Sequence, residues 1–381
     1  MRKADYCQTQ SLITERKGSL SITKNILSQK HSQVRWLNYY QKQFKNKTLK
    51  PLYVQWIATH KCNFRCPNCG GGARVPQRDE LSTNEIIHAI DDLANLGCRF
   101  LSAAGGEAIL REDIFVVLKY AKSKGISIGI ITNGYAIKEY TKQIEELNLD
   151  SIVVSIDGYG ENHDRIRNMP GSYQRCLESL DFFCKVGIPI IGTYTVTSEE
   201  NISDIPMIVE DVQRFGSTRH GLQLIIPEGR AVERKNSSLL VKKILRLILK
   251  TKKKNFSLEA SEGLGYLGPL EGKVRPYYFF CGCGWNTFTV MANGDIMGCP
   301  LFDFSNYSEG NIRQKSLINI WWSEFSRFRE VSFSELPKIC KACAYVMLCR
   351  GGCWQFRATG GEFCFLKEAK EVAMEFGIDG R

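Results

Sequence analysis

The sequence has no long apolar run. No uninterrupted apolar stretch reaches the roughly 18 residues that a membrane-spanning helix needs. Met1 to Thr48 is mostly polar and basic, without the apolar segment of a secretory signal peptide. These absences predict a cytoplasmic protein with no membrane partner. The 381 residues are 43% hydrophobic, which is enough for one large domain with appendages.

Acidic residues are in deficit, with 40 Asp and Glu against 51 Lys and Arg, so the formal net charge is +11. Such a surface favours an acidic partner. The densest basic run, Lys242 to Lys254, is interleaved with leucine and isoleucine and predicts an amphipathic helix. Its basic face is either a docking surface for an acidic segment or the solvated side of a core-packed helix. No other feature supports a nucleic-acid partner, and none is expected.

The chain contains fifteen cysteines, which would suit a disulfide-rich secreted protein. The missing signal peptide and the tight C-x2-C spacings predict cytosolic thiolates that bind metal instead. Cys62, Cys66 and Cys69 follow directly on the apolar run 52–58, a predicted buried strand. Three neighbouring cysteines cannot all pair as disulfides. A zinc knuckle would need His60 as a fourth ligand, whereas a 4Fe-4S cluster held by three cysteines keeps one iron open.

Strands and helices alternate from residue 51 onward. The predicted strands are 52–58, 100–103, 127–131, 151–156, 190–196 and 222–226. The predicted helices are 82–96, 113–124, 137–147, 173–186, 205–215 and 237–250. Apolar strands separated by amphipathic helices indicate a parallel sheet, covered on both sides or rolled into a barrel. Six units are too few for a closed eight-stranded barrel, so the predicted fold is α/β, a partial (β/α)6 TIM-like barrel.

Polar motifs follow four successive predicted strands. The first is the cysteine loop, and the others are Gly105-Gly106-Glu107, Thr132-Asn133-Gly134 and Ser155-Ile156-Asp157-Gly158. Each motif by itself has the residues of an ordinary turn. Together they predict a ligand site at the carboxyl ends of the strands. Glycines there allow a ligand to approach the backbone closely. Glu107 can hold an ammonium group, and Ser155 with Asp157 can hold ribose hydroxyls.

A second concentration of cysteines lies downstream, around an Asn293-Gly294-Asp295 hairpin turn. Its eight thiols are Cys281, Cys283, Cys299, Cys340, Cys343, Cys349, Cys353 and Cys364. Two four-cysteine metal sites are the simplest interpretation, and two structural zinc ions in a ribbon-like domain are the alternative.

Residues 51–230 resemble the core of a radical S-adenosylmethionine (SAM) enzyme, because the cysteine loop, the Gly-Gly-Glu turn and the Ser-x-Asp motif follow in family order. The resemblance implies that Cys62, Cys66 and Cys69 hold a 4Fe-4S cluster whose open iron binds SAM. One electron then cleaves SAM to methionine and a 5'-deoxyadenosyl radical. The residues expected to contact SAM are Gly105, Gly106, Glu107, Asn133, Ser155 and Asp157, with Arg165, Arg167 or Arg175 at its carboxylate. Asn68 departs from the family, which usually has an aromatic residue before the third cysteine.

The downstream cysteines are similar to the seven-cysteine SPASM domain that follows many radical SAM cores. The turn Pro227-Glu228-Gly229-Arg230 also resembles a loop of those proteins. The resemblance implies two auxiliary 4Fe-4S clusters, and therefore three clusters in all. Cys283, Cys299 and Cys353 would hold the first, and Cys340, Cys343, Cys349 and Cys364 the second. Cys281 lies just outside the pattern and either completes the first cluster or leaves it with an open iron.

Five segments are expected. They are an N-terminal extension at 1–50, the radical SAM core at 51–230, a basic helical connector at 231–280, the SPASM domain at 281–370 and a tail at 371–381. Many peptide maturases of this kind carry an N-terminal recognition domain, and the first 50 residues are too few for one.

The resemblance implies an enzyme that modifies a ribosomal peptide or protein by cross-linking, epimerisation or oxidation at an unactivated carbon. The expected partners are that substrate, for which the charge suits an acidic leader, and a reductant such as flavodoxin or ferredoxin. One alternative is a maturase of a haem-like or quinone-like small molecule, and another is a metal-stabilised binding scaffold without catalysis. No catalytic base is predicted. Cys98, Cys176 and Cys184 are predicted to be buried core thiols.

Overall fold

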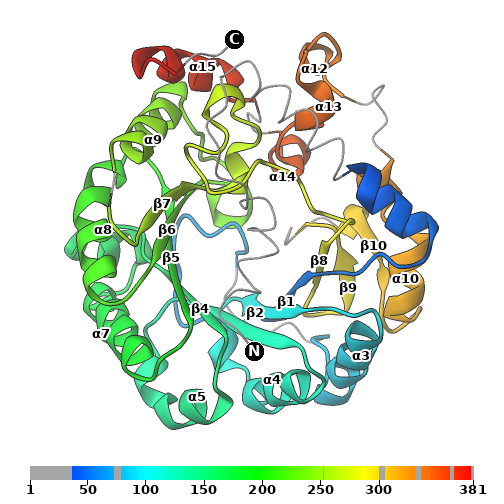
Figure 1. Ribbon diagram of the computed structural model, residues 1–381. Coiled ribbons are helices and arrows are strands. Elements are labelled where there is room, and N and C mark those ends of the chain that lie inside the picture. Colours follow the sequence, from blue (N-terminus) through cyan, green and yellow to red (C-terminus); the bar gives the residue numbers. More distant parts are fainter. Residues whose placement is uncertain are drawn as a thin grey trace.

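The computed structural model describes residues 37–72, 79–251, 253–299, 305–330, 336–360 and 364–378. Parallel strands form the inner wall of an open barrel, and helices cover it outside (Figure 1). The sheet order is β10-β9-β8-β1-β2-β3-β4-β5-β6-β7. The predicted α/β fold with a partial barrel is therefore confirmed, and the strands of the cysteine-rich half extend the same sheet.

The barrel strands are β1 (Tyr53–Thr59), β2 (Phe100–Gly105), β3 (Ser127–Thr132), β4 (Ser151–Ser155), β5 (Ile190–Thr197), β6 (Arg219–Leu224) and β7 (Ser257–Ala260). The remaining strands are β8 (Thr287–Val290), β9 (Asp295–Met297) and β10 (Ser308–Asn311). β8 pairs in parallel with β1, and β8 and β9 form the antiparallel hairpin that the Asn-Gly turn predicted.

The outer helices are α3 (Thr83–Asn95), α4 (Ile114–Ser123), α5 (Thr141–Leu147), α6 (Glu161–Arg167), α7 (Ser172–Lys185), α8 (Ile205–Arg214) and α9 (Ser238–Lys250). The later helices are α10 (Leu317–Ser323), α11 (Ser326–Arg329), α12 (Lys338–Lys341), α13 (Val346–Cys349), α14 (Trp354–Ala358) and α15 (Leu366–Glu375). The helix predicted from residue 82 begins with a capping box, in which the Ser82 and Glu85 side chains each accept the other's backbone N–H.

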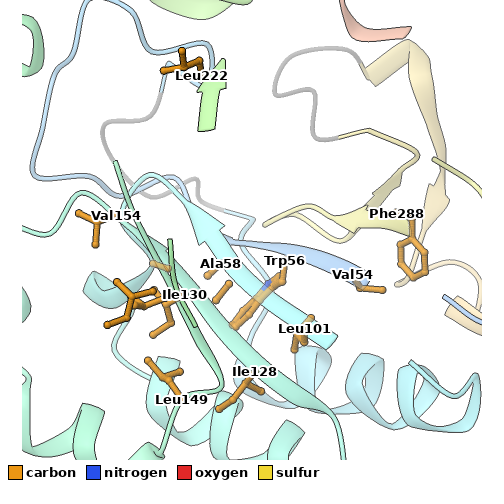
Figure 2. Packing of buried hydrophobic residues seen from close by; sticks show 14 of the residues in the cluster. Val54, Trp56, Ala58, Leu101, Ile128, Ile130, Leu149, Val154, Leu222 and Phe288 are labelled. Carbon is orange, nitrogen blue, oxygen red and sulfur yellow. The ribbon is translucent and has the colours of Figure 1, made fainter. Parts of the chain in front are cut away.

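The hydrophobic core lies between the outer face of the sheet and the helices. Trp56, Leu101 and Ile128 are fully buried there, on three adjacent strands (Figure 2). Side chains alternate along β1, so Trp56 packs into this layer while Tyr53 and Gln55 face the interior of the barrel. The side chains on the interior face of the sheet are therefore available to line a binding site.

The basic helix α9 is packed into the molecule. Its buried side chains are all apolar, and two of its cations pair with the C-terminal helix α15. Lys242 pairs with Glu371, and Arg246 pairs with Glu375 at 2.7 Å. The core-packed interpretation is therefore correct, and the basic face already has acidic partners within the chain.

Several predicted elements need correction. The sixth strand is Arg219–Leu224 rather than 222–226, because the alternation of buried residues begins at His220. Residues 137–147 form a 3-10 turn and the short helix α5, and α6 was not predicted. The segment 231–280 is more than a helical connector, since β7 extends the barrel. Cys184 is exposed, whereas Cys98 and Cys176 are buried as expected.

The described parts of the outer segments pack against the barrel. Residues 37–45 are helical, and Tyr40 stacks on Phe280 with ring centroids 5.5 Å apart. Most of the 1–50 extension and the last residues of the 371–381 tail lie outside the described residues. Within the described parts of the chain, no helix is long and apolar enough to cross a membrane.

Candidate active site

The Gly-Gly-Glu turn is attached to the start of the cysteine loop. Gly106 donates its backbone N–H to the Thr59 carbonyl at 2.8 Å, and Glu107 donates to the Lys61 carbonyl at 2.9 Å. A Cβ atom on Gly106 would clash with the Lys61 carbonyl and lie 2.9 Å from that of His60. The close approach that Gly105 and Gly106 allow is therefore to the protein's own backbone, and their contact with SAM stays a prediction.

Glu107 and Asn133 lie next to the cysteine loop. Glu107 accepts the Asn133 backbone N–H at 2.7 Å, and the Asn133 side-chain amide donates to Asn63 at 2.8 Å. Burial raises the pKa of Glu107 to about 7, against the lowering effect of the Asn133 N–H. Its second oxygen, Oε1, makes no hydrogen bond of ordinary geometry within the described residues. A buried carboxylate with one open oxygen fits the ammonium group of an amino acid.

Arg167 connects the cysteine loop to the end of β4. Its Nε atom lies 2.8 Å from the Asp157 carboxylate, and Nη1 lies 3.8 Å from the Cys66 sulfur. Asp157 also accepts the Val196 backbone N–H at 2.7 Å. Both oxygens of Asp157 therefore contact the protein, and ribose binding by Asp157 and the buried Ser155 stays a prediction.

The structure discriminates among the three candidate arginines for the SAM carboxylate. Arg165 is exposed and pairs with Glu200, and Arg175 lies 5.5 Å from the centre of the Tyr135 ring. Arg167 lies beside Cys66 and has only 12% of its side-chain surface exposed. It is therefore best placed to meet an anion bound near the cluster loop.

The sulfur atoms of the cysteine loop are suitable ligands for a positively charged iron-sulfur cluster. Burial raises the pKa of Cys62 to about 11, and burial also raises the pKa of Cys66, although the Arg167 charge opposes it there. Buried thiols become thiolates when a metal supplies the opposing charge. No three His, Cys, Asp or Glu side chains among the described residues could hold a single metal ion. The Asn68 side-chain oxygen is buried in this loop without a hydrogen-bond partner in the described residues.

The turn after β6 closes over the cysteine loop. Arg230 donates its backbone N–H to the Cys69 carbonyl at 3.1 Å, and its Nε to the Cys66 carbonyl at 2.8 Å. Gly229 has a left-handed φ of +53°, and a Cβ there would clash with the Gly70 carbonyl. The loop is therefore held from both sides, by this turn and by the Gly-Gly-Glu turn.

The downstream cysteines influence one another within two sets, and their assignment to two clusters stays a prediction. In the first, a hydrogen bond with Cys283 raises the pKa of Cys281 well above its usual range, and Cys283 also interacts with Cys299. Burial raises the pKa of Cys353 to about 12, and the nearby Cys281 adds to the effect. In the second group, burial raises the pKa values of Cys340 and Cys349, and in both cases a charge on Cys364 adds to it.

A cavity of about 810 Å³ occupies the barrel interior. Its lining includes the first cysteine group, Cys281, Cys283, Cys299 and Cys353. On β2, β3 and β4 its wall includes the small residues Ser102, Ser127, Gly129 and Ser151 beside larger ones. Small barrels are normally filled by large side chains, so these residues explain why space remains.

Glu262, in the 3-10 turn Glu262–Leu264 after β7, also lines the cavity, and its side chain is exposed. Although Glu262 is exposed to the cavity, the surrounding protein desolvates its carboxyl group, which raises its pKa against the lowering effect of the Arg275 charge. Glu262 and Gln355 were not singled out from the sequence, and Arg230 was noted there only as part of the turn 227–230. Only their place in the fold distinguishes them from other polar residues.

Two family models match the chain. Residues 56–212 match the radical SAM superfamily, and residues 281–344 match the SPASM iron-sulfur cluster-binding domain. The chain therefore belongs to the radical SAM superfamily and carries a SPASM domain. It is an oxidoreductase-type enzyme whose cofactors are SAM and 4Fe-4S clusters.

Similar proteins act on different substrates. The AdoMet-dependent heme synthase of Methanosarcina barkeri is 26% identical over 335 residues, which are 83% of this chain and 95% of that protein. The mycofactocin maturase MftC of Mycolicibacterium smegmatis is 26% identical over 327 residues, 82% of this chain and 80% of that protein. Among solved structures, Streptococcus suis SuiB bound to the precursor peptide SuiA has a TM-score of 0.65 at 17% identity, covering 90% of this chain and 79% of that one.

Proposed function

We propose that this enzyme modifies a ribosomal peptide or protein, held in the barrel cavity, at an unactivated carbon. The observation that carries the proposal is a cavity whose wall contains both the Glu262 carboxylate and the first group of downstream cysteines. A relative named as a maturase and a similar fold bound to a precursor peptide support the peptide class.

The roles proposed for the residues follow from their places. Cys62, Cys66 and Cys69 would hold the cluster that binds SAM, and bound SAM supplies the radical that abstracts hydrogen. Glu107 would bind the ammonium group of SAM, and Arg167 its carboxylate. The barrel wall would exclude water from the reacting carbon.

Glu262 would hold the proton that the substrate releases, because it is the glutamate in the wall of the cavity. The auxiliary clusters would be held by the two cysteine groups, with Cys281 in the first. A reductant such as flavodoxin or ferredoxin would supply the electron, and the basic surface suits such an acidic partner. A cytoplasmic location suits an enzyme with fifteen cysteines.

Co-expression with short peptides encoded beside this gene tests the proposal by mass spectrometry. A cross-link should remove two hydrogens from the peptide, and epimerisation should change the mass only in heavy water. Glu262→Gln should leave the peptide unmodified, whereas Glu233→Gln, an exposed glutamate outside the cavity, should not affect modification.

A haem-like substrate is the second candidate, and the similarity to the heme synthase favours it. Incubation of the enzyme with iron coproporphyrin and SAM distinguishes the two candidate functions. Peptides that stay unmodified, together with a porphyrin whose mass changes only when enzyme and SAM are both present, would contradict the peptide proposal.

A further inference from the structure

A chain of contacts joins the loop of the SAM cluster to the first auxiliary cysteine group. It begins at the turn after β6, where Gly229 and Arg230 are fixed against Gly70 and Cys69. The preceding residue, Glu228, is buried with only 5% of its surface exposed. The position of Glu228 is therefore set by the cysteine loop.

Gln355 continues the chain from the other half of the molecule. Its side-chain amide donates to the Glu228 carboxylate at 3.1 Å, and its other end, Oε1, lies 3.8 Å from the Cys299 sulfur. Gln355 is buried in the first turn of α14, two residues after Cys353. The amide therefore contacts both Glu228 and a proposed ligand of the auxiliary cluster.

We propose that Glu228 and Gln355 are positioning residues that set the reduction potential of the auxiliary cluster at Cys299, with the Gln355 amide holding the Glu228 carboxylate beside it. A negative charge near a cluster disfavours the addition of an electron. The electron that leaves the substrate would pass to this cluster, so its potential controls that step.

The proposal rests on the cluster assignment made above, but not on the identity of the substrate. Cys299→Ala tests that assignment separately, because it should lower the iron content of the reconstituted protein. If the iron content does not fall, the assignment is wrong rather than the electrostatic argument alone.

Redox titration of the reconstituted full-length enzyme, followed by electron paramagnetic resonance, tests the pair. Glu228→Gln removes the charge and should shift the auxiliary potential upward. Gln355→Glu places a charge beside Cys299 and should shift it downward. Glu309→Gln is the matched control, a carboxylate with 8% of its side-chain surface exposed that accepts a backbone N–H from Phe325, and should leave the potential unchanged.

Opposite shifts in the two variants would support the proposal. Potentials equal to that of the wild type in both would overturn it. If Gln355→Glu does not assemble its cluster, the isosteric Glu228→Gln decides alone: an upward shift supports the proposal, and any other result contradicts it.

Discussion

A single buried residue, His220, makes the stability of this fold depend on pH. His220 on β6 is fully buried between the Thr193 and Thr195 hydroxyls, at 2.8 Å and 2.9 Å. Burial lowers the pKa of His220 to about 3, whereas an unfolded histidine titrates near 6.5. The unfolded state therefore binds the extra proton, and stability falls as the pH drops below 6.5. Because of this residue, the free energy of unfolding should fall by about 1.4 kcal/mol when the pH drops from 7.5 to 5.5.

Anaerobic chemical denaturation at the two pH values measures this cost. His220→Gln should reduce the difference between them by about that amount, because glutamine does not titrate. His88→Gln on the exposed face of α3 is the matched control and should retain the wild-type difference. An unchanged difference in His220→Gln would show that other groups carry the pH dependence.

Among the elements, the turn after β2 positions the cysteine loop. Gly106→Ala would force a methyl group into the Lys61 and His60 carbonyls, which are backbone atoms and cannot swing aside. We expect a loss of about 1–3 kcal/mol in stability and reduced iron in the SAM cluster. Gly221→Ala, whose Cβ would meet Tyr194 at an ordinary 3.6 Å, should retain its iron. Full iron occupancy in both variants would contradict the role of the turn.

The whole molecule should hold about twelve irons after anaerobic reconstitution, if each cysteine group binds one 4Fe-4S cluster. Cys66→Ala should lose about four of them together with all cleavage of SAM. Cys343→Ala should retain part of the SAM cleavage while losing substrate turnover, because the second auxiliary group is separate from the SAM loop. Iron and 5'-deoxyadenosine are measured on the same samples. Equal loss of both activities in Cys343→Ala would make the auxiliary clusters purely structural.

How far the sequence predicts this molecule depends on the distance between interacting residues. The cysteine loop and the capping box at Ser82 were predictable, because their residues are close neighbours in the chain. The bond between Glu228 and Gln355 spans 127 positions, and no local pattern signals it. Arg167 could be separated from Arg165 only by burial. The pairing of β8 with β1 was missed for the same reason, since hairpin periodicity does not identify a partner strand.

The place of β8 has a consequence for synthesis on the ribosome. β1 lies between β2 and β8, so one edge of the first barrel strand acquires its neighbour only when Thr287–Val290 has been translated. Until then the nascent chain presents an open strand edge, which is the kind of surface that pairs with other chains. The topology therefore exposes this edge to pairing with other chains until β8 has been synthesised.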